Sequence, residues 1–136
     1  MPRFVLLEHT GAPDDPAGLH YDLLLEQGEH CRTWRLAEIP EPDGPEVVAS
    51  ELLPHRLAWL DHEAGEVSGG RGFARRIDAG TYEPAARPEP DPNPRAAVEV
   101  TLQGQRLAGT LELRAHEDRW IARLVRLRSE TDVDAR

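Results

Sequence analysis

The chain has 136 residues, of which 39% are hydrophobic and 30% charged, and its formal net charge at pH 7 is −9. This length suits one domain with a single core. The negative charge opposes tight non-specific binding of nucleic acid, so any such contact must be local or metal-assisted. All 16 basic residues are arginine, which excludes Schiff-base catalysis and the lysine-dependent phosphate loops.

Turn-forming residues are frequent: 12 prolines and 11 glycines accompany a regular supply of Leu, Val and Ile. This composition favours short strands over long helices. No apolar run reaches the 18 residues of a membrane span and the N-terminus has no signal-peptide pattern, so we expect a cytoplasmic protein with no membrane partner. Cys31 is the single cysteine; we interpret it as a small buried residue.

Three strands are predicted at the start of the chain. Residues 3–9 form the first, and an exposed loop at 11–18 follows it. Residues 19–26 form the second strand, and Gln27-Gly28 is the tip of a hairpin that leads into the third at 30–36.

The middle of the chain is less regular. Residues 47–49 and 57–60 are plausible short strands, with room for a short helix between them. Residues 73–77 are predicted to be another strand that ends in a turn at 78–80, and 84–94 an extended proline-rich loop.

The last part alternates apolar and other residues over 98–102, 107–113 and 120–125, which predicts a three-stranded meander. In total we expect an all-β fold, a small closed or partly open barrel of about eight mostly antiparallel strands with at most one short helix. The predicted domain covers residues 3–126, and 127–136 form a short tail.

Two polar residues on the second strand need an explanation. His20 and Asp22 point to the same side, with Cα atoms about 6.5–7 Å apart, while Leu23 takes the core side. His9 on the neighbouring strand would complete a two-histidine, one-carboxylate set that suits Mn²⁺, Fe²⁺ or Zn²⁺. Spacing alone also fits a solvated face or a histidine hydrogen-bonded to a carboxylate. Glu8 or Glu26 is expected to orient a histidine.

Residues 3–9 read RFVLLEH and 18–26 read GLHYDLLLE, and the segments RTW, PHRLAWLDHEAG, DAGTYE and LAGTL follow in order. Together they resemble the 3′-phosphoesterase domain of bacterial DNA ligase D over about residues 3–126. The resemblance implies a small β-barrel that binds Mn²⁺, or another divalent transition metal, and trims 3′-phosphates and 3′-ribonucleotides from DNA or RNA–DNA ends. Polymerase and ligase activities would then reside on separate chains.

Carried over residue by residue, the resemblance makes His9, His20 and Asp22 metal ligands and His55 a phosphate contact. The family motif His-Tyr-Asp-x-Arg, however, ends here at Leu24, and two further basic positions of the family fall near Glu38 and Val47. Each change removes a cation that would hold phosphate, which weakens the expected activity.

Replacement cations are available elsewhere in the chain. Arg71, flanked by glycines, is predicted to contact phosphate, the alternative being a solvated charged turn. Arg35 is a second candidate. The remaining histidines are expected at the surface and the tryptophans in the core. These residues are His30, His62 and His116, and Trp34, Trp59 and Trp120.

Three functions remain open on these observations. The first is a metal-dependent phosphoesterase acting on 3′ ends of DNA in repair, in which His55 stabilises charge or donates a proton. The second is a catalytically impaired relative that binds a metal, a nucleic-acid end or a protein partner. The third is a phosphoesterase for another small phosphate ester.

Overall fold

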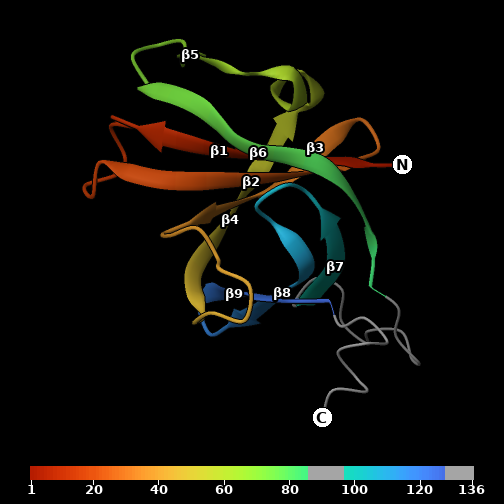
Figure 1. Cartoon of the computed structure of the whole chain (residues 1–136). Helices are drawn as coiled ribbons and strands as arrows, with labels where there is room; N and C mark the ends of the chain where they lie inside the picture. Colours follow the sequence, from red (N-terminus) through yellow and green to blue (C-terminus); the bar gives the residue numbers. More distant parts are fainter. Residues whose placement is uncertain (86–96, 128–136) are drawn as a thin grey trace, which may run out of the picture.

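The computed structural model describes residues 1–85 and 97–127, and within these ranges nine strands form one continuous sheet (Figure 1). One short 3-10 helix, η1 (Leu57–Asp61), accompanies them, and no helix in the described residues has the length and hydropathy needed to cross a membrane. The strands are β1 (Arg3–Thr10), β2 (Leu19–Gln27), β3 (His30–Leu36), β4 (Val47–Arg56), β5 (Ala64–Glu66), β6 (Phe73–Pro84), β7 (Ala97–Gln103), β8 (Ala108–His116) and β9 (Arg119–Val125).

The sheet closes on itself. The strand order is β1-β2-β3-β4-β9-β8-β7-β6-β5, and β1 also pairs with β6, so that eight strands form a ring and β5 lies outside it. Every pairing between these strands is antiparallel. The shortest strand pairing in the ring is that of β4 with β9, where Val47–Ala49 pair with Trp120–Ala122. The prediction of an all-β barrel of about eight strands is therefore confirmed.

One strand prediction was wrong, because residues 57–60 form η1 rather than a strand. The strand predicted at 47–49 is confirmed as the start of β4, which continues to Arg56 where a short helix was expected. Pro54 is tolerated inside β4 because this half of the strand pairs with β3 alone. The expected loop at 84–94 and the tail at 127–136 lie largely outside the described residues.

The turn predicted at 78–80 was also wrong, because β6 continues through it. The buried Asp78 carboxylate accepts hydrogen bonds from the backbone N–H groups of Gln105, Arg106 and Leu107, at 3.1, 3.0 and 2.7 Å. These bonds hold the β7–β8 turn against β6. A tertiary role of Asp78 thus overrides its local preference for turns.

Alternation along the strands produces two apolar layers. Inside the ring lies the main core, which includes Phe4, Leu23, Trp34 and Trp120. On the opposite face of β1, β2 and β3 lies a smaller group, which we call the outer cluster. It consists of Val5, Leu7, Leu24, Cys31 and Leu60, with Leu57, Trp59 and Ala79 packed against it.

Segment η1 covers the outer cluster and is tied to the barrel by arginines. Arg3 and Arg76 both donate from Nη2 to the Leu60 carbonyl, at 3.0 and 3.3 Å, and Arg76 Nε donates to the His62 carbonyl at 3.2 Å. Figure 1 shows η1 and β5 on one side of the β1–β2–β6 wall, with β7, β8 and β9 on the other. Segment η1 therefore covers part of this outer face, and a cleft lies beside it.

Candidate metal centre

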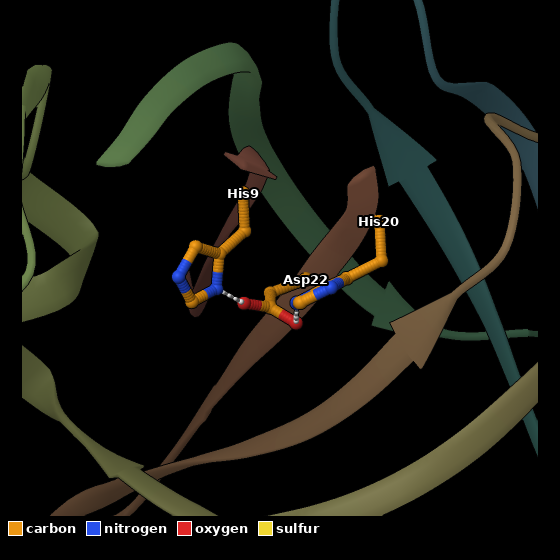
Figure 2. Close-up of side chains that lie close together, drawn as sticks. All are labelled: His9, His20 and Asp22. Atoms are coloured by element: carbon orange, nitrogen blue, oxygen red, sulfur yellow. Dashed lines mark hydrogen bonds and ion pairs between the residues drawn. The ribbon is translucent and has the colours of Figure 1, made fainter. Parts of the chain in front are cut away.

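Three side chains of the β1–β2 hairpin meet on this outer face. His9 lies directly across the strand pair from His20, and Asp22 lies opposite Leu7. One ligand atom from each of His9, His20 and Asp22 lies within 4.8 Å of the others. Figure 2 shows the two imidazoles on either side of the Asp22 carboxylate. The structure thus brings together the three residues that strand spacing predicts on one face.

Two atoms of this group are buried without a hydrogen-bond partner. His20 is 2% exposed and Asp22 6% exposed. Within the described part of the chain, His20 Nε2 and Asp22 Oδ1 make no hydrogen bond, although they lie 3.3 Å apart. Leaving buried polar atoms unsatisfied is costly, and native proteins seldom do so without a reason. A divalent cation between the three residues would satisfy both atoms, so the donor set fits a metal ion.

The outer partners of the two histidines fix which nitrogen is free. His9 Nε2 lies 2.7 Å from the Arg71 carbonyl oxygen. Because a carbonyl only accepts, Nε2 carries the proton, and the neutral imidazole then has its lone pair on Nδ1, which lies 3.3 Å from Asp22 Oδ2. His20 Nδ1 lies 2.8 Å from Asp15 Oδ2 and donates to it, which leaves the lone pair on Nε2. Both free lone pairs belong to the nitrogens that face Asp22, an arrangement typical of metal-binding histidines.

The prediction that Glu8 or Glu26 orients one of these histidines was wrong. Glu8 pairs with Arg75 at 3.2 Å, and Glu26 accepts a hydrogen bond from the backbone N–H of Arg3. Asp15 and the Arg71 carbonyl take their place. Asp15 lies in a turn that the sequence marks only as exposed, and a backbone carbonyl leaves no signal in a sequence.

Burial and charge act in opposite directions on His20. Desolvation lowers its pKa, but the neighbouring carboxylates of Asp22 and Asp15 outweigh it, so the pKa of His20 is raised above its ordinary value. The hydrogen bond from His20 lowers the pKa of Asp15. Without a metal ion, His20 therefore binds a proton more readily than a free histidine, and a metal ion must compete with that proton.

A cleft of about 680 Å³ opens beside the metal ligands. Its walls come from β1, β2, β3, the second half of β4, η1, the start of β6 and the loops at 12–14 and 67–71. His55 lines it from β4, where it pairs with Cys31 of β3. His55 Nδ1 donates to the Leu53 carbonyl at 2.9 Å, which leaves Nε2 free to interact with a ligand.

Arg71 and Arg35 also line the cleft, with different bonding. The Arg71 guanidinium donates to the carbonyl and hydroxyl oxygens of Ser68, at 2.6 and 3.1 Å, within its own loop. Arg35 extends from β3 beside Asp22 and pairs with Asp14 at 3.2 Å. Arg56, at the end of β4, is a third arginine that lines the cleft.

The three residues that stand at expected basic positions, Leu24, Glu38 and Val47, lie away from the cleft. Leu24 is fully buried in the outer cluster, Val47 is buried in the main core, and Glu38 is exposed beyond the end of β3. None of the three is among the residues that line the cleft in the described structure.

Most of the remaining aromatic and histidine predictions agree with the structure. Trp34 and Trp120 lie in the main core with their rings 5.7 Å apart, and His30 and His116 are exposed. Trp59 instead is half-buried at the cleft, 4.8 Å from the ring of His62. His62 is also half-buried and contacts the Ala74 carbonyl through Nε2.

A family model described as the DNA ligase D 3′-phosphoesterase domain matches residues 12–114, which is most of the chain. The matched range includes His20, Asp22 and His55, whereas His9 precedes it, so the place of His9 in the cluster depends on the geometry of the β1–β2 hairpin. No curated protein matches the chain. The chain belongs to the family of DNA ligase D 3′-phosphoesterase domains.

Proposed function

We propose that this protein is a metal-dependent phosphoesterase that acts on 3′-phosphate or 3′-ribonucleotide ends of DNA during repair. One observation carries the proposal: two buried ligand atoms, His20 Nε2 and Asp22 Oδ1, have no hydrogen-bond partner among the described residues. They lie beside a cleft of a chain that belongs to a 3′-phosphoesterase family.

In this proposal His9, His20 and Asp22 hold the cation, preferably Mn²⁺, with Zn²⁺ or another transition metal as alternatives. Bound there, a divalent cation supplies Lewis-acid chemistry to a phosphoryl group. Asp15 and the Arg71 carbonyl keep the histidine lone pairs aimed at it.

His55 is the proposed proton donor. Its free Nε2 faces a cleft that admits a phosphate ester. When water attacks phosphorus and the bond to the 3′-oxygen breaks, that oxygen needs a proton to leave as a hydroxyl. A protonated His55 supplies it, and from a 3′-phosphate end the products are a 3′-hydroxyl end and inorganic phosphate.

The test is an assay on a primer-template that ends in a 3′-phosphate or a single 3′-ribonucleotide. With Mn²⁺ the wild type should leave a 3′-hydroxyl, and chelation, His20→Ala or His55→Ala should abolish this. His116→Ala is the matched control, because His116 is exposed and lies outside the cleft. Activity that persists in the His20→Ala variant would contradict the proposal.

A second candidate is an impaired relative that binds a nucleic-acid end without turnover. The observation that favours it is Leu24, an uncharged and fully buried residue where the family motif has arginine. This candidate predicts Mn²⁺ binding and retention of the 3′-phosphorylated end with no phosphate release. Release of phosphate from a small ester but not from DNA would instead indicate a different substrate.

A further inference from the structure

Arg35 lies beside the metal ligands on a neighbouring strand. Its Cα pairs with that of Asp22 in the β2–β3 register, so both side chains point to the outer face. Arg35 also lines the cleft, together with His9 and His55. The guanidinium is therefore placed where a phosphate held at the His9–His20–Asp22 cluster would meet it.

The bonding of Arg35 is incomplete. Nη2 pairs with the two Asp14 carboxylate oxygens at 3.2 and 3.4 Å. Nε is buried and has no hydrogen-bond partner among residues 1–85 and 97–127. The Nε and Nη2 edge of a guanidinium normally binds an anion through two parallel hydrogen bonds. Asp14 uses only half of that edge.

The Asp14 carboxylate is easily displaced. Its side chain is 71% exposed, in the loop between β1 and β2, whereas that of Arg35 is 24% exposed. An ion pair with one partner in water is weak because solvent screens it. Two oxygens of a phosphate would accept hydrogen bonds from both Nε and Nη2 of Arg35. The displaced Asp14 carboxylate would then be solvated by water.

We propose that Arg35 is the phosphate-binding arginine of this cleft and that Asp14 occupies its guanidinium until phosphate arrives. This inference rests on the proposed function, because it assumes that the cleft receives a phosphate ester. Arg71 is the weaker candidate, since its guanidinium already donates twice to Ser68. Arg35 thus supplies from β3 the cation that β2 lacks at Leu24.

Two variants test the proposal through the affinity of the Mn²⁺-loaded protein for inorganic phosphate, measured by calorimetry. Arg35→Lys keeps the charge but loses the two-donor edge, and we expect it to weaken phosphate binding about 10- to 100-fold. Asp14→Asn removes the competing carboxylate and should strengthen binding several-fold. The control is Arg75→Ala, because Arg75 pairs with Glu8 much as Arg35 pairs with Asp14, but does not line the cleft.

Mn²⁺ affinity, measured in the same samples, should stay within about twofold in both variants, since neither residue is a metal ligand. Unchanged phosphate affinity in both variants, or no phosphate binding by the wild type, would overturn the role of Arg35. If phosphate binds as expected but DNA ends are not processed, the proposed function fails and the assignment of Arg35 stands.

Discussion

The Arg71 carbonyl is held against His9 by a loop that depends on Gly72. The backbone of Gly72 has φ +95°, and a Cβ built there would clash with the Thr10 carbonyl oxygen and lie 2.8 Å from the Gly11 carbonyl carbon. These are backbone atoms, so no side-chain rotation relieves the clash. Gly72→Ala should therefore push the 67–72 loop away from β1 by about 1 Å, the shift needed to restore ordinary contact distances.

That shift would lengthen the 2.7 Å contact between His9 Nε2 and the Arg71 carbonyl oxygen to about 3.7 Å, beyond hydrogen-bond range. Loss of a group that orients a metal-binding histidine typically lowers metal affinity 10- to 100-fold. We expect a loss of about this size for Mn²⁺ in Gly72→Ala, with a decrease of about 1–3 kcal/mol in the free energy of unfolding.

Calorimetric titration with Mn²⁺ measures the affinity, and denaturant unfolding shows that the variant is folded. Gly70→Ala is the matched control: Gly70 has φ +68° in the same loop, but its added Cβ would meet no atom within 4 Å. It should lose similar stability and keep Mn²⁺ affinity within about twofold of wild type. A folded Gly72→Ala variant that binds Mn²⁺ as tightly as wild type would refute the role given to the Arg71 carbonyl.

Three further predictions concern buried polar groups. Asp78→Ala leaves three backbone N–H groups without their acceptor and should lower the free energy of unfolding by about 3–5 kcal/mol, whereas the exposed Asp118→Ala should change it by less than about 0.5 kcal/mol. Burial raises the pKa of Cys31 to about 11 from 9.0, so alkylation of the native thiol at pH 8 should be roughly 100-fold slower than after unfolding, and equal rates would contradict this. Because folding raises the pKa of His20, protonation of His20 stabilises the metal-free fold, fully so below the unfolded pKa of 6.5. This stabilisation is lost as pH rises through the folded pKa. Melting temperatures should therefore fall with rising pH in chelator and rise in Mn²⁺, and His20→Gln should remove both trends.

The parts of the fold that follow from local pattern were accessible from the sequence. Alternation along 19–26 assigned Leu23 to one face and His20 and Asp22 to the other, and the structure places them so. The hairpin register then brings His9 opposite His20. These relations involve neighbouring strands, where a period of two suffices.

The rest depends on how distant segments meet. Asp78 lies in a turn-like sequence, yet its role is set by residues 27 to 29 positions later. The contact between His9 and the Arg71 carbonyl spans 62 positions. Leu57 to Leu60 is too short an apolar run to distinguish a strand from a helical turn without knowing what covers the outer cluster.

The three candidate ligands all belong to one hairpin, with His9 and Asp22 only 13 positions apart. Closing so short a segment around an ion has a small entropic cost even in an unfolded chain. A denatured chain should therefore retain some metal, and excess Mn²⁺ should protect the fold less than its native affinity implies. Arg35, His55 and Arg71 come from separate segments and converge only when the ring is closed, so chelation can precede recognition of phosphate as the chain folds.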